Sequence, residues 1–429
     1  MGPAHRDNEA MPVYGQSEQL SSSPPGEVTA WSPLRQKVFR ALWIASVVSN
    51  IGTWMQSTAT AWLMTTLAPS AVMVSLVQTA TSLPIFLLAL PAGALADSMD
   101  RRRLILITQV WMLLSALLLS VLTLTGHTTP WVLLTLTLML ALGMAMNAPA
   151  WQTVIPEMVH PSEIPSAIAL NSAGFNLARF IGPAIGGLVV GLAGAGAAYL
   201  CNALSYVGVI AVLLAWHSPP GKDQARDGRI LRRIESGLRY VFLSEPLRAI
   251  LLQAACFVMC ASAQMALLPL WAKEILGVDS AGYGFLVGSF GLGAVAGALV
   301  LPPMRRRMSL ENLSRVSILA FAVNLAGMGL VGWLPAAIVG LFVGGVGWLM
   351  LLSSFNGSVQ LVVPTWVRGR AMAVYLLIFF GGMALGSFLW GTVASMVGMQ
   401  RALLLASLGL CLGPVVGLRF KLPAGTSQT

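Results

Sequence analysis

Long apolar runs, separated by short polar segments, cover most of this chain. Each run is long enough to cross the ~30 Å hydrocarbon core of a bilayer as a helix of ~20 residues. The pattern therefore predicts an all-α membrane protein. Its twelve predicted transmembrane helices occupy residues 41–66, 71–96, 104–125, 131–154, 166–191, 197–216, 248–271, 281–301, 315–333, 336–362, 371–397 and 402–418.

Polar segments divide these helices into two sets of six. Residues 38–216 are predicted to form an N-terminal six-helix bundle, and residues 248–418 a C-terminal one. The polar residues 1–37 and 419–429 are predicted to be cytoplasmic tails, the first of them disordered. The connection at 217–247 is either an amphipathic helix on the inner membrane surface or a plain solvated linker.

The distribution of positive charge predicts the orientation of the chain. All but three of the 25 Lys and Arg residues fall on the side that carries both termini. Lys273 and Arg401 fall on the opposite side, and Arg179 lies within the predicted helix at 166–191. Because cytoplasmic loops retain Lys and Arg, both termini are predicted to be cytoplasmic in a multi-pass protein of the inner (plasma) membrane. This bias explains the net charge of +10 without a nucleic-acid partner.

Composition excludes several classes of function. Hydrophobic residues make up 56% of the chain and charged residues 9%, against ~25% charged in soluble proteins. None of the 15 Asp and Glu residues falls in the middle of a predicted helix, and the four His residues lie in a tail or in loops. The four Cys residues have no metal or disulfide spacing, and no ATP-binding Gly-x-x-x-x-Gly-Lys-Ser/Thr motif occurs. The sequence therefore predicts no enzyme, no metal, no cofactor and no visible proton relay.

An internal repeat relates the two sets of helices at an offset of 204 residues. The Gly-Ala-Leu sequence at 93–95 recurs at 297–299, and the three arginines at 101–103 recur at 305–307. Two parallel repeats of six helices around a central pathway are the architecture of the major facilitator superfamily.

The segment after the second predicted helix resembles the loop signature of that superfamily, Gly-x-Leu-x-Asp-(Arg/Lys)-x-Gly-Arg-(Arg/Lys). The matching residues are Gly93, Leu95, Asp97, Arg101 and Arg102. The resemblance implies that Asp97 and Arg101, with Gly93 and Arg102, form a cytoplasmic gate. In such a gate the carboxylate lies at the start of the eleventh helix, where the helix dipole favours a negative charge. Alternatively, the arginines only fix the topology.

The fifth predicted helix carries a Gly-Pro-x-x-Gly-Gly element that resembles the signature of proton-driven exporters in the superfamily. Its residues are Gly182, Pro183, Gly186 and Gly187. Proline removes a helical hydrogen bond and bends the helix, and glycine lets another helix approach closely. Ordinary packing of small residues is the alternative interpretation.

Further segments are similar to the exporter group that contains the enterobactin exporter and the macrolide efflux proteins. These segments are residues 50–56, 100–103, 169–179, 267–270 and 282–284, and the likeness covers roughly residues 35–420. The resemblance implies a secondary active exporter that works by alternating access and is coupled to protons, although no relay is visible in the sequence. Uncoupled, gradient-driven export is the alternative.

Arg179 is the one charge that the pattern places near the middle of the bilayer. An arginine there costs about 2.5–3.5 kcal/mol on insertion scales and keeps its charge. We expect Arg179 either to face a water-filled cavity, where it attracts an anionic group, or to bond helix carbonyls as a structural residue. The other candidates for the cavity wall are Asn50, Trp54, Gln56, Asn171, Asn176 and Gln264.

The sequence therefore predicts a monomeric exporter whose partners are a small-molecule substrate and the lipid bilayer. The substrate is expected to be a mid-sized amphipathic or anionic compound, such as a siderophore. A multidrug or macrolide efflux pump is the alternative within this class. A membrane scaffold or a lipid scramblase is the alternative from another class.

Overall fold

The computed structural model describes residues 29–216, 244–364 and 367–419, without the side chains of 89–90, 93–94, 96–98 and 412–419. These residues form helices and no strand. The predicted 217–247 connection therefore lies almost wholly outside the described residues, and its nature stays a prediction. The helices are α1 (Lys37–Leu67), α2 (Ala71–Ser98), α3 (Arg101–Leu124), α4 (Pro130–Val154), α5 (Ile164–Ala215), α7 (Glu245–Glu274), α8 (Ser280–Arg307), α9 (Leu310–Leu330), α10 (Leu334–Val362), α11 (Arg368–Val397) and α12 (Met399–Arg419), with short 3-10 helices at Ser32–Arg35, Ile155–Met158 and Pro161–Glu163.

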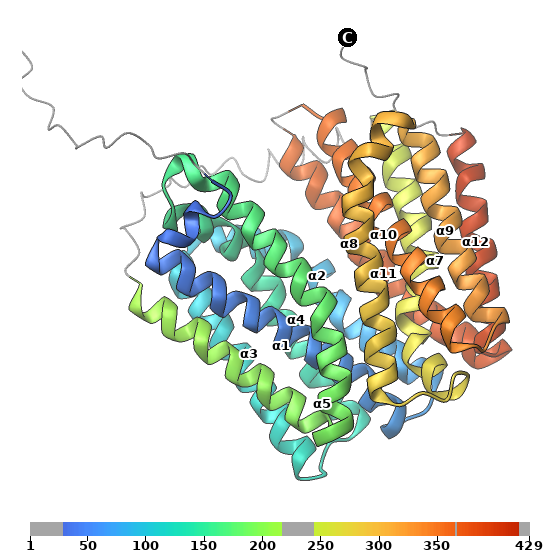
Figure 1. Cartoon of the computed structure of the whole chain (residues 1–429), viewed down its shortest axis with the longest axis horizontal. Coiled ribbons are helices and arrows are strands. Elements are labelled where there is room, and N and C mark those ends of the chain that lie inside the picture. The colour runs from blue at the N-terminus through green and yellow to red at the C-terminus, as the bar shows by residue number, and fades with distance from the viewer. Residues whose placement is uncertain (1–28, 217–243, 365–366, 420–429) are drawn as a thin grey trace, which may run out of the picture.

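The prediction of an all-α membrane protein is confirmed. Within the described ranges, nine helices are long and apolar enough to cross a membrane, with α5 counted once. The helix α5 has 52 residues and contains one non-helical residue, Gly194, with φ 81° and ψ 168°. Glycine adopts a positive φ without steric cost, so the chain reverses there and α5 becomes a hairpin of two arms (Figure 1). The reversal falls between the predicted helices at 166–191 and 197–216. The exact number of membrane crossings stays a prediction.

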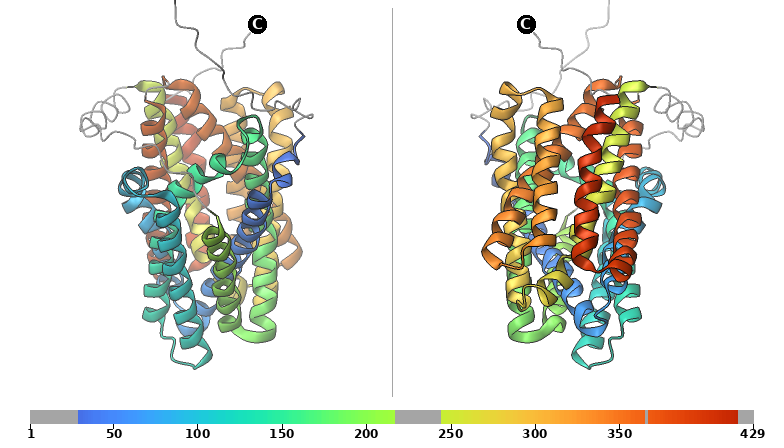
Figure 2. Two further views of the ribbon diagram at one scale, coloured as in Figure 1. Left: turned by 90° about the vertical axis from the view of Figure 1, so that its left-hand side faces the viewer. Right: turned by 90° about the vertical axis from the view of Figure 1, so that its right-hand side faces the viewer.

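The helices form two bundles that lie side by side. Helices α1 to α5 form the N-terminal bundle and helices α7 to α12 the C-terminal bundle (Figure 1). The helices of both bundles run between the same two ends of the molecule (Figure 2). We call the end at which α1 begins and α12 ends, and which carries the loop at 99–100, the terminal end. The opposite end, with the loops at 68–70 and 275–279, is the far end.

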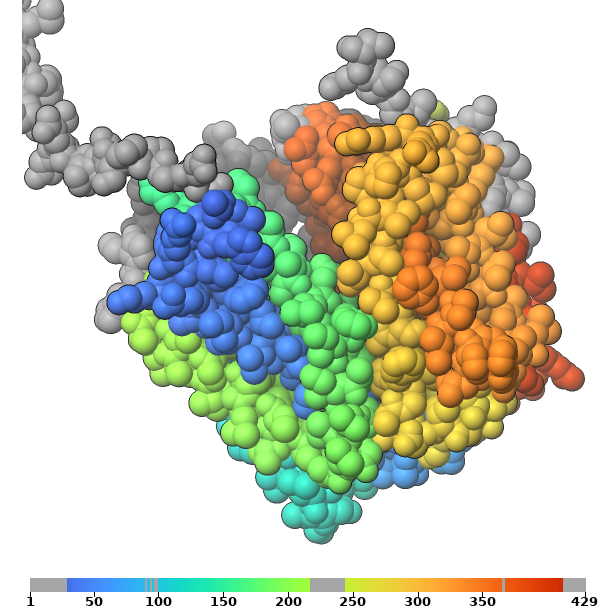
Figure 3. All heavy atoms as spheres, in the orientation of Figure 1, coloured from blue at the N-terminus to red at the C-terminus, as the bar shows by residue number. Residues whose placement is uncertain are grey.

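The two bundles contact each other mainly through helices α5 with α8 and α2 with α11. These contacts involve the parts of the helices that are nearer to the far end. Gly187 of α5 packs against Gly284 of α8, and Thr79 Oγ1 of α2 donates to Ala384 O of α11 at 3.1 Å. At the terminal end the surface is hollowed between the bundles (Figure 3). The molecule is therefore closed at the far end and open at the terminal end.

The interior of the C-terminal bundle is filled by aromatic side chains. The Phe257 ring lies 5.4 Å from the Phe321 ring and 5.7 Å from the Trp348 ring, centroid to centroid. Phe290 and Phe379 also contact Trp348, at 6.2 Å and 6.0 Å. Edge-to-face and tilted contacts of this kind stabilise a rigid apolar core.

Candidate functional site

A cavity of about 550 Å³ lies within the N-terminal bundle. All five helices of that bundle, with both arms of α5, contribute to its wall. Its aromatic and methionine side chains include Trp54, Trp151, Phe175, Met112 and Met144. Eight side-chain amides of the described residues also line the cavity. These amides belong to Asn50, Gln56, Gln109, Asn147, Gln152, Asn171, Asn176 and Asn202.

Five of the seven predicted cavity residues line this space. They are Asn50, Trp54, Gln56, Asn171 and Asn176. Their positions are those expected of a substrate cavity, and their role in binding stays a prediction.

Two predicted residues lie elsewhere. Gln264 is completely buried in the C-terminal bundle, where its Oε1 accepts a bond from Asn324 Nδ2 at 2.5 Å. Arg179 is not part of the cavity wall; its guanidinium lies 5.8 Å from the centre of the Trp54 ring. Trp54 itself lines the cavity, so Arg179 contacts a residue of the wall without being part of the wall.

The polar wall residues that were missed in the sequence include four large ones, Gln109, Gln152, Asn202 and Tyr206, besides several serines and threonines. All four are polar residues within or at the end of apolar helices, and this is the signal that could have identified them.

Neutral hydrogen bonds hold the inner part of the wall in place. Asn202 Nδ2 donates to Gln56 Oε1 at 2.5 Å and to Tyr206 Oη at 3.2 Å, which joins α1 to the second arm of α5. Thr108 Oγ1 donates to Asn147 Oδ1 at 3.0 Å, which joins α3 to α4. Such bonds orient amide groups that would otherwise be free to rotate.

No Asp, Glu, Lys, Arg or His side chain lines the cavity in the part of the chain that the structure describes. An ion in this space would lose hydration without gaining a partner of opposite charge, which is unfavourable. Aromatic side chains, by contrast, offer broad apolar contact, and Trp54 and Phe175 pack edge to face at 6.2 Å. The cavity is therefore suited to uncharged, amphipathic compounds.

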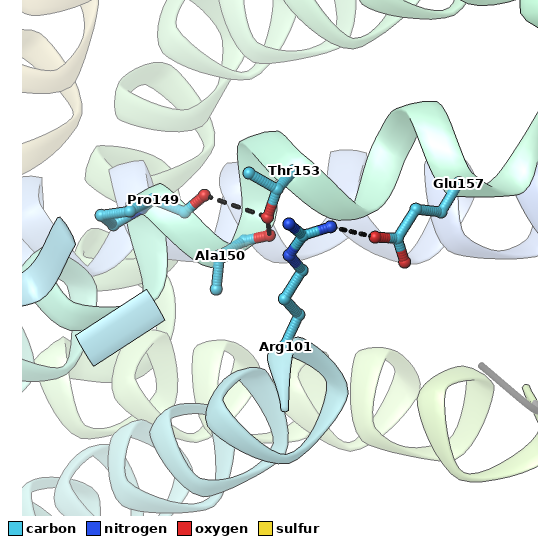
Figure 4. A network of polar contacts seen from close by, with 5 residues as sticks. All are labelled: Arg101, Pro149, Ala150, Thr153 and Glu157. Carbon is cyan, nitrogen blue, oxygen red and sulfur yellow. Dashed lines mark hydrogen bonds and ion pairs between the residues drawn. The ribbon is translucent and has the colours of Figure 1, made fainter. Parts of the chain in front are cut away.

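At the terminal end, Arg101 of the predicted gate forms an ion pair with Glu157 (Figure 4). Arg102 donates to the carbonyl oxygens of Leu213 and Leu214 at 2.7 and 2.9 Å, at the end of α5. Both interactions lie within the N-terminal bundle. The side chains of Gly93 and Asp97 lie outside the described residues, so the role of the gate stays a prediction.

The Gly-Pro-x-x-Gly-Gly element packs α5 between two other helices. Gly182 and Gly186 face α1, where an added Cβ would come within 2.5 Å of the Trp54 side chain and 2.8 Å of the Met55 backbone. Gly187 faces α8 of the other bundle. Pro183 lies inside α5, yet Gly194 is the residue with non-helical angles. The glycines of this element therefore allow α5 to pack closely against α1 within its own bundle and against α8 of the other bundle.

A lysine bridges the bundles at the far end. Lys273 Nζ of α7 donates to Thr65 O at 2.9 Å and to Thr66 Oγ1 at 3.3 Å, at the C-terminus of α1. The same ammonium lies 6.0 Å from the ring centre of Trp62, which stacks on Tyr283 of α8 at 5.7 Å. A cation is favourable at a helix C-terminus and over an aromatic face. These contacts join α1, α7 and α8 and help to close the far end.

Comparison with known proteins agrees with this architecture. The family model described as transmembrane secretion effector, within the major facilitator superfamily, matches residues 28–429. The chain belongs to this family. It is therefore a multi-pass membrane protein of transporter family and fold.

Several curated proteins of this superfamily are similar to the chain. The staphyloferrin A transporter of Staphylococcus aureus is 24% identical over 364 residues, which are 83% of this chain and 89% of the transporter. The multidrug efflux pump Tap of Mycolicibacterium fortuitum is 25% identical over 386 residues, 87% of this chain and 93% of the pump. An enterobactin exporter of Shigella boydii is 25% identical over 362 residues, 84% and 86% of the two chains.

Solved structures share the fold. A bacterial homologue of the lysosomal transporter Spinster, in an inward-facing and unoccupied conformation, superposes with a TM-score of 0.73 at 14% identity, covering 90% of this chain and 98% of the homologue. A bacterial homologue of the iron transporter ferroportin, in an inward-facing state, gives 0.68 at 17% identity over 90% and 98% of the two chains.

Proposed function

We propose that this member of the transmembrane secretion effector family is a secondary active exporter of a mid-sized amphipathic compound. The compound enters the cavity of the N-terminal bundle from the cytoplasm. The two bundles then rock about the cavity and release it on the other side of the membrane. The observation that carries the proposal is the amide- and tryptophan-lined cavity in a molecule closed at the far end and open at the terminal end.

Charge supports the direction of transport. The terminal end carries the arginine clusters Arg101 to Arg103 and Arg305 to Arg307. Loops rich in arginine stay in the cytoplasm, so an opening at this end would face the cell interior. A compound made or accumulated inside the cell could then enter directly.

Two candidate substrates follow from different observations. The names of two relatives, a staphyloferrin A transporter and an enterobactin exporter, favour a siderophore. The absence of charge from the described cavity wall favours an uncharged drug-like compound, and a third relative is named a multidrug efflux pump.

Proton coupling is part of the proposal and rests on the family resemblance. The described cavity wall offers no carboxylate or histidine to carry a proton. Coupling would therefore use groups at the terminal end, such as Glu157 and Glu163, or the ionisation of the substrate itself.

Inside-out membrane vesicles test the proposal. Vesicles with the protein should accumulate enterobactin, staphyloferrin A or chloramphenicol when energised, and a protonophore should abolish the accumulation. Equal accumulation with and without the protein, for all three compounds, would contradict export. Accumulation that persists after the proton gradient collapses would contradict coupling alone. Lipid flipping by the reconstituted protein without compound transport would favour a scramblase.

A further inference from the structure

We infer that Gln109 forms a subsite for an uncharged group that donates and accepts hydrogen bonds, such as an amide or a hydroxyl. Compounds that carry such groups and no net charge would then be the preferred substrates. The inference rests on the proposed function, because the subsite is part of the same cavity.

The side chain of Gln109 is buried and has no partner. Gln109 lies on α3, is 4% exposed and lines the cavity. Its Oε1 is enclosed without a hydrogen-bond partner among the described residues. A buried amide that bonds nothing is unfavourable, so such a group in a cavity is a place where water or a ligand binds.

The neighbouring amides of the wall are already engaged. The Gln56 and Asn147 side-chain oxygens accept bonds from Asn202 and Thr108, at 2.5 and 3.0 Å. Gln109 is therefore the buried wall amide whose hydrogen-bonding capacity no described neighbour uses, and a half-turn of the amide decides which of its two groups turns toward the cavity. Gln264 also has an unpartnered amide nitrogen, but it is enclosed in the C-terminal bundle and lines no part of this cavity.

The chemistry of an amide defines the class of ligand. A glutamine side chain offers one carbonyl acceptor and one NH2 donor, and a half-turn of the amide exchanges the two. A group that both donates and accepts satisfies either arrangement. Met112 lies one turn along α3 from Gln109 and also lines the cavity, so the polar group of the ligand would adjoin an apolar surface.

The surroundings select against charge. The described wall holds no ionised side chain, and Arg179 contacts the Trp54 ring without lining the cavity. A carboxylate or an ammonium at Gln109 would lose its hydration shell and gain only neutral contacts, whereas a hydroxyl or an amide regains its hydrogen bonds. The subsite therefore discriminates between neutral and ionic groups of similar size.

Isothermal titration calorimetry on the purified full-length protein tests the inference. The probes are chloramphenicol, which carries hydroxyls and an amide and is uncharged, ethidium as a cation and salicylate as an anion. We expect chloramphenicol to bind more tightly than either ion. We expect Gln109→Leu to weaken chloramphenicol binding about 5- to 10-fold, the effect of one lost neutral hydrogen bond, and to leave the other two unchanged.

Gln400→Leu is the matched control, because Gln400 is an exposed glutamine of α12 that does not line the cavity. It should change chloramphenicol binding less than about twofold. The thermal unfolding midpoint of the ligand-free protein gives a readout that does not need a ligand. Gln109→Leu should raise this midpoint, because it removes a buried amide with an unpaired oxygen, and Gln400→Leu should not.

Failure of the inference differs from failure of the proposed function. Unchanged chloramphenicol binding by Gln109→Leu, tighter binding of the ions, or no binding of chloramphenicol by the wild type would overturn the inference. Export of siderophores in the vesicle assay could still stand after any of these results. If the vesicles export no compound of any class, the proposed function itself fails.

Discussion

The two bundles have related sequences, but the N-terminal bundle encloses a cavity and the interior of the C-terminal bundle is filled by aromatic side chains. Each contains a pair of hydrogen-bonded amides: Gln56 with Asn202 in the N-terminal bundle and Gln264 with Asn324 in the C-terminal bundle. The first pair lines a cavity of about 550 Å³. The second pair is 0% and 3% exposed, in a bundle whose interior is filled by rings such as Trp348. An internal repeat thus conserves the arrangement of helices without conserving what lies between them.

This difference indicates that the two bundles have different roles in transport. The N-terminal bundle offers hydrogen-bonding groups and space, which a substrate needs. The C-terminal bundle has the close aromatic packing of a rigid body. In alternating access, a rigid partner can rock against a bundle that holds the substrate. Substitutions in each bundle test this difference in role, beginning with the crossing of α5 and α8 between the bundles.

The largest effect is expected at the crossing of α5 and α8. In Gly187→Leu, the new Cβ would meet backbone atoms of Ser280 and Gly284. Backbone cannot move aside like a flexible side chain, so the far end could no longer close. We expect export in the vesicle assay to fall more than ~10-fold at equal membrane expression.

Gly327→Leu is the control for this substitution. Gly327 lies within α9, and no atom lies within 4 Å of its added Cβ. Export by Gly327→Leu should stay close to that of the wild type. Normal export by Gly187→Leu would show that the tight crossing is not needed for closure.

The comparison of the bundles is tested most directly by removing each amide pair. Gln56→Leu with Asn202→Leu strips polar groups from the cavity wall, and we expect a roughly tenfold loss of export, the effect of about 1.4 kcal/mol. Gln264→Leu with Asn324→Leu should leave export within about twofold. Gln264 Nε2 and Asn324 Oδ1 have no hydrogen-bond partner in the described structure. Replacing both residues should therefore keep or raise the thermal unfolding midpoint.

Equal losses of export from the two double substitutions would show that the two bundles do not differ in this role. A loss from the second pair alone would place substrate contacts in the C-terminal bundle. Membrane expression and the unfolding midpoint, measured for both, separate a defect in transport from a defect in folding.

The contrast between the bundles also explains which features the sequence could predict. Apolar run length predicted the helices, and the gap between residues 191 and 197 matched the reversal at Gly194. Polar residues on α1 and α5, such as Asn50 and Asn171, were placed at the cavity because apolar helices keep polar groups away from lipid.

The polarity of a residue alone does not show whether its side chain faces the cavity of the N-terminal bundle or the closed interior of the C-terminal bundle. Gln264 has the same signal as Gln56, yet it faces Asn324 of α9 inside a closed bundle. Gln109 and Asn202 line the cavity because of the rotation of their helices, and that rotation is set by packing against neighbours. The depth of Arg179 in the bilayer left two positions open, at the cavity or bonded to helix carbonyls, whereas its contact with the Trp54 ring depends on side-chain geometry.

A smaller effect is expected from the lysine at the far end. Lys273→Met removes the bonds to Thr65 and Thr66 and the contact with Trp62. We expect the equilibrium to shift about fivefold toward a state open at the far end, the effect of about 1 kcal/mol. Labelling of a single cysteine introduced at the far end, compared in rate between variants, measures the shift.

Arg401→Met is the control for Lys273→Met, because Arg401 is the other cation predicted on that side and is exposed. Its labelling rate should equal that of the wild type. Lys273→Arg keeps the charge and should retain most of the closure. Identical rates for Lys273→Met and the wild type would mean that Gly187 and its neighbours close the far end without the lysine.

The smallest effect is expected for the ion pair of Arg101 with Glu157, whose side chains are 33% and 28% exposed. An exposed ion pair contributes about 0–1 kcal/mol, so Arg101→Gln and Glu157→Gln should each change the unfolding midpoint little.

Export distinguishes two roles for the pair. If it only holds the start of α3 against the end of α4, each single variant and the double variant should export equally. In the second role, Arg101 leaves Glu157 and pairs with a group on the C-terminal bundle when the terminal end closes. Arg101→Gln should then lower export two- to fivefold, because about 1 kcal/mol would be lost in the closed state alone. Glu157→Gln should not lower export. We expect the second result, because the pair as observed lies wholly within one bundle and cannot by itself close the terminal end.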